Sequence, residues 1–264
     1  MSNLIHKELS YLVQGIFLKV YNQLGPQLPE KFYQQAITLG LQKQGIHCIP
    51  EKDYIVPYRN QTAGLFQIDH WLEQGQIILE IKVDSAIKPL HKAQTISYLK
   101  LTQADLAIIA NFGTKSLEYE RLPNFIRNKS VDFQWQPKTR TQNTPYPELL
   151  DLLFEALHLV HFTLGPGFIH RVYRQAVMIE LQHQNIPFQF FQKLPLYFDQ
   201  NYIGELNAQM IQVDQKILLG VFALKTIDEM MGVIMKKRMK MLGMKVGVLA
   251  NYYGEKLEVE VLMN

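Results

Sequence analysis

The chain has 264 residues, of which 47% are hydrophobic and 19% charged, with a net charge of +3 at pH 7. This composition excludes a disordered protein, and the absence of an apolar run near 18 residues or of a signal-peptide pattern leads us to expect a cytoplasmic protein. The single cysteine, Cys48, excludes an internal disulfide, a multi-cysteine zinc site and an iron–sulfur cluster.

The N-terminal half predicts two helices, then strands, a third helix and further strands. An amphipathic helix near 4–22 is followed by a second that starts at Pro29 and stops at Gly45, because proline suits a first helical turn and glycine a helix end. Apolar or alternating stretches predict strands at 46–57, 65–72 and 77–83, a helix at 87–101, and strands at 106–111 and 117–122. This order indicates a mixed α/β domain.

The same domain occurs twice, because a shift of 140 positions aligns the two halves without a gap. Leu24-Gly25-Pro26 recurs as Leu164-Gly165-Pro166, and Tyr33-x-Gln35-Ala36 recurs as Tyr173-x-Gln175-Ala176. The period far exceeds that of stacked solenoid repeats, so each copy is a domain of its own. We call residues 1–124 copy one and residues 141–264 copy two.

A polar, proline-punctuated stretch separates the two copies. It runs from Gln136 to Pro147 and has the composition of a linker. We therefore predict domains at 1–135 and 148–264, joined by a linker at 136–147. Each is expected to be a central mixed β-sheet flanked by helices.

Three charged residues are predicted to share one face of two paired strands in copy one. If the four-residue loop 73–76 pairs Leu72 with Ile77, then Asp69 lies opposite Glu80, about 5 Å away at Cβ. The two-residue period of a strand places Lys82 on the same face. Two opposed carboxylates at this spacing can share one divalent cation.

Two helices supply further polar side chains. Glu30 begins a helical stripe whose other members, Tyr33, Ile37 and Leu41, are apolar, so Glu30 can point inward. After the strands, three side chains share one face of the next helix at spacings of three and four: His91, Gln94 and Tyr98. Together these residues predict an acidic pocket with one lysine and a polar wall.

These residues resemble a known nuclease signature. Asp69-x10-Glu80-x-Lys82 resembles the motif of the PD-(D/E)xK nuclease superfamily, Glu30 its helical glutamate, and Gln94-x3-Tyr98 the QxxxY element of its RecB-like exonuclease branch. Gly25-x4-Glu30-x2-Tyr33, with the later Asn111-Phe112-Gly113, resembles the small bacterial GxxExxY proteins of that superfamily. The resemblance covers most of copy one and implies a restriction-endonuclease-like fold in each copy.

The resemblance also implies a chemistry, the metal-dependent hydrolysis of phosphodiester bonds. Asp69 and Glu80, with Glu30 and the carbonyl of Ile81, would hold Mg²⁺ or Mn²⁺. Lys82 would orient or help deprotonate the attacking water, and Gln94 and Tyr98 would steady the substrate strand or a metal-bound water. The implied partner is nucleic acid, with DNA ahead of RNA.

Each of these residues also has a purely structural interpretation. Glu30 could favour the positive end of its helix, and Asp69, Glu80 and Lys82 could form a solvated charge group across two strands. His70 is predicted to be a core histidine on the opposite face.

Copy two is an internal control, because both copies should keep what the fold needs and only one must keep what catalysis needs. At the offset of 140, the six site positions become His170, Gln209, Gly220, Phe222, Ile234 and Arg238. All six are lost together, whereas the glycine turns and the tyrosine stripe persist. We therefore interpret copy two as a degenerate pseudo-domain that forms an internal pseudo-dimer with copy one, with further self-association left open.

The charge distribution is compatible with a polyanionic partner. Residues 1–140 carry 16 Lys and Arg against 12 Asp and Glu, a net of +4, and the remainder carry 11 against 12, a net of −1. A basic cluster in copy two could be a solvated helix face or a phosphate track: Lys236, Lys237, Arg238, Lys240 and Lys245. Two alternatives to a nuclease stay open: a non-catalytic nucleic-acid-binding or scaffold protein, and an enzyme acting on another phosphorylated substrate.

Overall fold

A computed structural model describes residues 4–125, 132–136 and 144–264. The chain forms two compact units, which we describe separately: unit 1 contains residues 1–56 and 65–131, and unit 2 contains residues 57–64 and 132–264. Most of the linker predicted at 136–147 lies outside the described residues.

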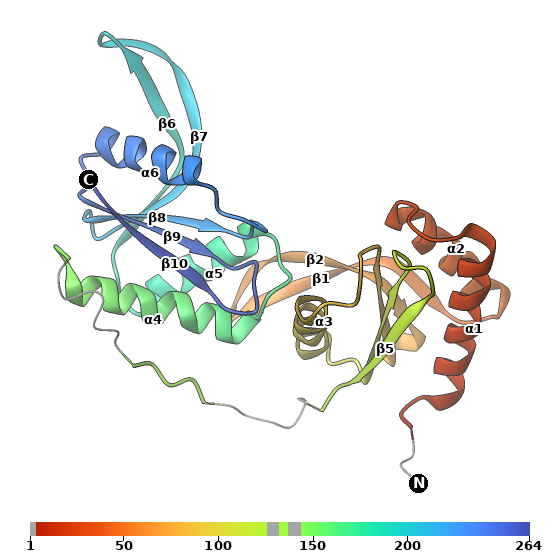
Figure 1. Cartoon of the computed structure of the whole chain (residues 1–264). Helices are drawn as coiled ribbons and strands as arrows, with labels where there is room; N and C mark the ends of the chain where they lie inside the picture. The colour runs from red at the N-terminus through yellow and green to blue at the C-terminus, as the bar shows by residue number, and fades with distance from the viewer. Residues whose placement is uncertain (1–3, 126–131, 137–143) are drawn as a thin grey trace. The chain divides into compact units, whose positions relative to one another are not determined.

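The elements of copy one follow the predicted order (Figure 1). They are α1 (Lys7–Leu24), α2 (Glu30–Lys43), β1 (Cys48–Tyr58), β2 (Gln61–Leu72), the short 3₁₀ helix η1 (Glu73–Gly75), β3 (Ile77–Lys82), α3 (Pro89–Thr102), β4 (Leu106–Asn111) and β5 (Glu118–Pro123). The main difference is in β2, which begins four residues before the predicted strand at 65–72. A two-residue turn joins β1 to β2, and the two strands form a long hairpin.

The sheet of unit 1 has the order β1-β2-β3-β4-β5. β3 and β4 are parallel, and α3 connects them, as a parallel pair requires a crossover. Leu72 pairs with Ile77, which confirms the predicted register of β2 and β3. Figure 1 shows α3 on the other side of this sheet from α1 and α2.

The alternation of side chains along β3 separates a core face from a polar face. Ile77, Leu79 and Ile81 are buried in the core that α1 and α2 form with β3 and β4. Because neighbouring strand residues point to opposite faces, Glu80 and Lys82 lie on the side covered by α3. The sheet thus carries the predicted charged residues next to a packed core.

Unit 2 repeats this plan in copy two. Its elements are α4 (Pro147–Leu164), α5 (His170–His183), β6 (Phe188–Phe198), β7 (Asn201–Val213), β8 (Ile217–Phe222), α6 (Glu229–Met241), β9 (Val246–Asn251) and β10 (Glu258–Met263). The sheet order is β10-β9-β8-β7-β6, with β8 and β9 parallel. The two five-stranded mixed sheets with their helices confirm the predicted α/β class and the duplication.

The turn between β1 and β2 packs as part of unit 2. Tyr58 donates a hydrogen bond to Glu180 Oε2 at 2.7 Å, and Arg59 contacts both oxygens of the same carboxylate at 2.7 and 2.9 Å. Gly64 lies so close to Val172 that a Cβ on the glycine would be 2.8 Å from a Val172 methyl group. We call residues 57–64 the first hairpin tip.

Among the helices that the structure describes, none is both long enough and apolar enough to span a bilayer.

Candidate active site

Asp69 lies near the end of β2, where two hydrogen bonds fix its carboxylate. The backbone N–H of Ile81 donates to Oδ2 at 2.7 Å, and the amide of Gln34 on α2 donates to Oδ1 at 2.9 Å. The first bond ties Asp69 to β3, the strand that carries Glu80 and Lys82. The structure therefore holds this carboxylate at the junction of β2, β3 and α2.

Glu80 and Lys82 form an ion pair on the polar face of β3. The Lys82 ammonium lies 2.5 Å from Glu80 Oε1, and both side chains are largely buried, with 20% and 8% of their surface exposed. The period of two along a strand makes this contact natural, since both side chains leave the same face.

Glu30 joins the group through α2. It is half-buried in the first turn of the helix, and its Oε1 accepts a hydrogen bond from Gln34 Nε2 at 3.3 Å. Gln34 thus bridges Glu30 and Asp69. Gln34 was not among the predicted site residues, although its position one helical turn after Glu30 on the same face was a usable signal.

The charges of these residues act on one another. Burial and the charge of Glu80 raise the pKa of Asp69 to about 8. Burial also raises the pKa of Glu30, and there the charge of Lys82 opposes the charge of Glu80. Burial disfavours the charged form of Lys82, but the three carboxylates outweigh it and raise the pKa of its ammonium. Lys82 is therefore a fixed cation near neutral pH.

The helix α3 borders this group. His91 is buried in its first turn, where its Nδ1 accepts a hydrogen bond from the backbone N–H of Lys88 at 3.2 Å. Burial and the nearby charge of Lys82 lower the pKa of His91. The Lys88 ammonium also donates hydrogen bonds to both carboxylate oxygens of Asp84, at 2.7 and 2.6 Å. Neither Asp84 nor Lys88 was predicted, although both lie in the segment between β3 and α3.

Two predicted residues lie further along α3. Gln94 is half-buried, and Tyr98 is buried with its ring stacked on Phe66 of β2 at a centroid distance of 5.0 Å. The stacking positions Tyr98 against the strand that carries Asp69. The roles assigned to Gln94 and Tyr98 remain predictions.

His70 is buried in the core, as expected for a residue next to Asp69 but on the opposite face. Its Nε2 lies 3.0 Å from the hydroxyl of Thr38 and 3.1 Å from the carbonyl oxygen of Gln34, both on α2. Burial lowers the pKa of His70 to about 4, so the ring is neutral near pH 7.

The donor atoms fit a divalent cation in chemical kind. Asp69, Glu80 and Glu30 supply carboxylate oxygens, which Mg²⁺ and Mn²⁺ prefer. Burial is the main cause of the raised pKa of Asp69 and Glu30, and a cation would relieve the repulsion from Glu80 that adds to it. In the part of the chain that the structure describes, no three His, Cys, Asp or Glu side chains are gathered closely enough to hold a metal ion. Binding would therefore require the carboxylates to turn toward one another.

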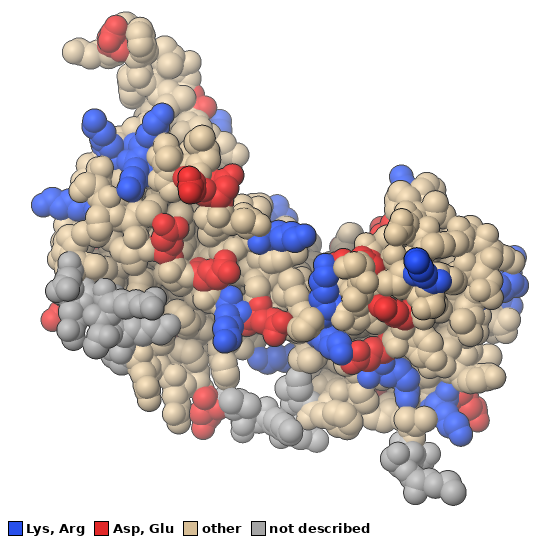
Figure 2. Space-filling model, in the orientation of Figure 1, with Lys and Arg blue, Asp and Glu red and all other residues tan. Residues whose placement is uncertain are grey.

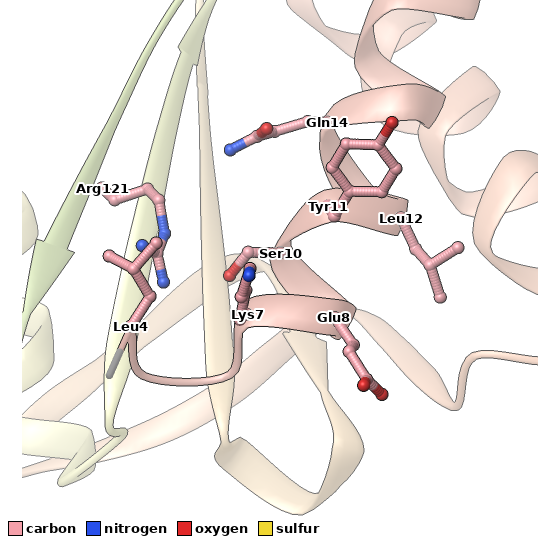
Figure 3. A pocket seen from close by; sticks show the side chains of 8 residues that line it. All are labelled: Leu4, Lys7, Glu8, Ser10, Tyr11, Leu12, Gln14 and Arg121. Carbon is pink, nitrogen blue, oxygen red and sulfur yellow. The ribbon is translucent and has the colours of Figure 1, made fainter. Parts of the chain in front are cut away.

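Two hollows lie near copy one. One, of about 450 Å³, is formed largely by α2 and reaches Asp69. The other, of about 600 Å³, lies at the start of α1 next to Arg121, and none of Glu30, Asp69 and Glu80 lines it (Figure 3). Only the first is connected with the candidate site.

Between residues 144 and 264, the described part of copy two, there is no comparable group. Its β7 and β8 pair one residue out of step with β2 and β3, because Val213, rather than Gln212, pairs with Ile217. Gly220 therefore faces Met210, and neither Met210 nor Gln209, the residue at the offset of 140, has a carboxylate. Basic side chains gather instead over α6 (Figure 2), whose last turn carries Arg238 and Lys240.

Comparison with known protein families gives a match in both copies. A family model described as "PD-(D/E)XK nuclease superfamily" matches residues 7–122 and again residues 147–262. No curated protein matches the chain. Among solved structures, one described as "Crystal structure of SSO0001" is 16% identical with a TM-score of 0.28, and the match covers 35% of this chain and 48% of the other.

Proposed function

Because the chain belongs to the PD-(D/E)XK nuclease superfamily, we propose that copy one is a metal-dependent nuclease and that copy two has lost this activity. The proposal includes membership of the GxxExxY group, nucleic acid as substrate with DNA ahead of RNA, and action in the cytoplasm. Mg²⁺ or Mn²⁺ would be held by Asp69, Glu80, Glu30 and the carbonyl of Ile81.

The observation that carries the proposal is the convergence of Asp69, Glu80 and Lys82. Three strand residues, brought together by the pairing of β2 with β3, are joined by Glu30 through Gln34. Their counterparts in copy two contain neither a carboxylate nor a lysine: His170, Gln209, Gly220 and Phe222. A charge group that served only the fold would be expected in both copies.

The chain's own residues suit this reaction. A bound divalent cation supplies Lewis-acid stabilisation of charge on the phosphate and activation of water. The raised pKa of Lys82 favours a role as a fixed positive charge that orients water or phosphate, and not as a base. Gln34 holds Asp69 in place, and Gln94 and Tyr98 would contact the substrate strand.

Cleavage by the purified full chain tests the proposal. Labelled single-stranded DNA, double-stranded DNA and RNA are incubated with Mg²⁺ or Mn²⁺, and with a chelator as the control. We expect cation-dependent cleavage that Glu80→Ala and Lys82→Ala each reduce by about 100-fold or more. Equal cleavage by wild type and both variants would show that the activity comes from elsewhere.

A second function has one observation in its favour. Lys82 forms an ion pair with Glu80, and within the described ranges no three potential ligands lie close enough together to hold a metal ion. This is expected for a non-catalytic nucleic-acid-binding or scaffold protein that uses a nuclease fold for its surface. This function predicts nucleic-acid binding without turnover and no heat of Mn²⁺ binding in calorimetry, even with substrate present. Mn²⁺ binding that is lost in Glu80→Ala protein would exclude it.

A further inference from the structure

The hairpin of β6 and β7 carries an unusual apolar end. Figure 1 shows this hairpin extending beyond the rest of the sheet of unit 2. Four large side chains near its turn are more than half exposed: Tyr197 (62%), Phe198 (68%), Tyr202 (59%) and Ile203 (64%). Exposed groups of this size mark an interaction surface more often than a solvated loop. We call residues 197–204 the second hairpin tip.

Its counterpart in copy one shows what such a tip can do. The first hairpin tip is related to it by the offset of 140, and there Tyr58 and Ala63 are only 2% and 3% exposed. Tyr58 and Arg59 bind Glu180 on α5, and Arg59 Nη1 lies 3.2 Å from His183 Nε2. The first hairpin tip thus docks on α5, the second helix of copy two, and this shows that a hairpin tip of this fold can dock on such a helix.

The receiving face on α5 has an uncovered equivalent on α2. Val172, Ile179 and Glu180 are at most 2% exposed. Their counterparts on α2 are Phe32, 44% exposed, Leu39, 58% exposed, and Gly40. The exposed side chains on this side of α2, which we call the open face, are Phe32, Leu39 and Lys43, whereas Gly40 beside them packs on Ile16 of α1.

The two uncovered surfaces have changed in matching ways. The Tyr58 hydroxyl and its acceptor Glu180 are both gone, because Phe198 and Gly40 stand in their places. The charged residues also differ: Arg59 on the first tip corresponds to Asp199 on the second, and His183 on α5 corresponds to Lys43 on α2. The second tip is thus apolar with one acid, and the open face is apolar with one base, and opposite charges at a docking surface favour the correct partner.

We propose that the second hairpin tip of one chain docks on the open face of α2 in a second copy of the same chain. Phe198 takes the place that Tyr58 has on α5, next to Phe32 and Leu39, and Asp199 pairs with Lys43. The contact joins different surfaces of the two chains, so it produces either a closed pair, with both tips docked, or a longer series of copies.

Sedimentation velocity of the full chain over a range of concentrations tests this proposal. We expect wild type to form species larger than the 30.7 kDa monomer as concentration rises, and Phe198→Ser protein to remain monomeric. The matched control is Tyr119→Ser, which removes another exposed aromatic side chain, on β5, and should associate like wild type. A wild-type chain that stays monomeric at all concentrations overturns the proposal.

A charge exchange identifies the two surfaces. Asp199→Lys and Lys43→Glu should each weaken association by about 3- to 10-fold in Kd, since each places like charges together. The double variant Asp199→Lys/Lys43→Glu restores opposite charges and should recover most of the loss. Additive weakening in the double variant would mean that these residues do not meet, and it would overturn the assignment even if the chain self-associates.

Discussion

Tyr33 in copy one and Tyr173 in copy two make the same two hydrogen bonds. Tyr33 donates to the carbonyl of Gly25 at 2.7 Å and accepts from the N–H of Leu28 at 3.0 Å. Tyr173 donates to Gly165 at 2.7 Å and accepts from Phe168 at 3.1 Å. Each ring also stacks on an aromatic residue after the fourth strand of its sheet. The shared tyrosine therefore fixes the turn between the first two helices.

Asn111 and Asn251 form a second shared device. Each ends the fourth strand of its sheet, and each amide donates to a glutamate of the fifth strand at 3.1 Å. Each side-chain oxygen also accepts a backbone N–H from the loop that follows the third strand. The asparagine at this position is thus a structural residue in both copies.

The residues that differ between the copies are concentrated at the end of the third strand. Copy one has the charged pair Glu80 and Lys82 there, and copy two has Gly220 and Phe222. The Phe222 ring lies over Gly220, where a Cβ would be 2.6 Å from it. Copy two therefore has an aromatic ring where copy one has a charged pair. This difference supports our proposal that the chemistry belongs to copy one.

The largest expected effect comes from paired substitutions at one position in both copies. Asp69→Asn removes the carboxyl group that faces Glu80 but keeps the shape of the side chain, and we expect nuclease activity to fall by about 100- to 1,000-fold. Gln209→Asn is the matched change in copy two, and asparagine tolerates the positive φ of 53° at that residue. We expect it to leave cleavage unchanged, as measured by initial rates with Mn²⁺. A similar loss in both variants would remove the distinction between the copies.

The next effect concerns the hairpin tips. Arg59→Ala leaves the fully buried Glu180 carboxylate without its bidentate partner, and breaking a buried pair in this way costs about 3 kcal/mol. Asp199→Ala, the matched change in the second tip, should alter the free energy of unfolding of the monomer by less than about 0.5 kcal/mol. In a Trp71→Phe background, tryptophan fluorescence during urea denaturation reports on unit 2, because the remaining Trp135 packs on His158. Equal effects of the two changes would contradict the difference between the tips.

Much of the fold could be predicted from local sequence signals. The apolar periods located the helices and strands, and the loop 73–76 fixed the pairing of Leu72 with Ile77. The pattern could not show that β2 begins at Gln61, because residues 61–64 are small or polar and are held by a long hairpin. Nor could it show that residues 57–64 pack in unit 2, since that depends on contacts more than 100 positions away.

The candidate site was predicted in part for the same reason. The strand period placed Glu80 beside Lys82, and the helical stripe turned Glu30 inward, so local geometry was sufficient for these residues. Gln34 was missed because its importance comes from bridging Glu30 to Asp69, which requires α2 to pack against β2. The sequence also gave no sign that copy two shifts its strand pairing by one residue, because a shorter turn at Asp214 produces that shift.

The pH dependence of stability should distinguish the two tips further. Burial opposes ionisation of Glu180, but hydrogen bonds from Arg59, Tyr58 and Gln184 outweigh it and hold its pKa below the ordinary value of 4.5. A lowered pKa in the folded state stabilises the fold above the unfolded pKa, and this stability is lost as pH falls through the folded value. We expect the Tm of unit 2 to drop below pH 4.5, and the drop to be smaller in Glu180→Gln protein. Parallel curves for both proteins would show that Glu180 titrates normally.

The smallest effect tests how closely the first tip packs. Gly64→Ala places a Cβ 2.8 Å from a methyl group of Val172, and a β-branched side chain in a helix has little freedom to move away. We expect a loss of about 1 kcal/mol in the free energy of unfolding, typical of overpacking. Val172→Ala should make room, so the double variant should be more stable than the sum of the single losses predicts. Phe32 occupies the position on α2 that corresponds to Val172 on α5. Additive losses in urea denaturation would mean that Gly64 and Val172 do not pack on each other, and they would also weaken the equivalence of the two helix faces.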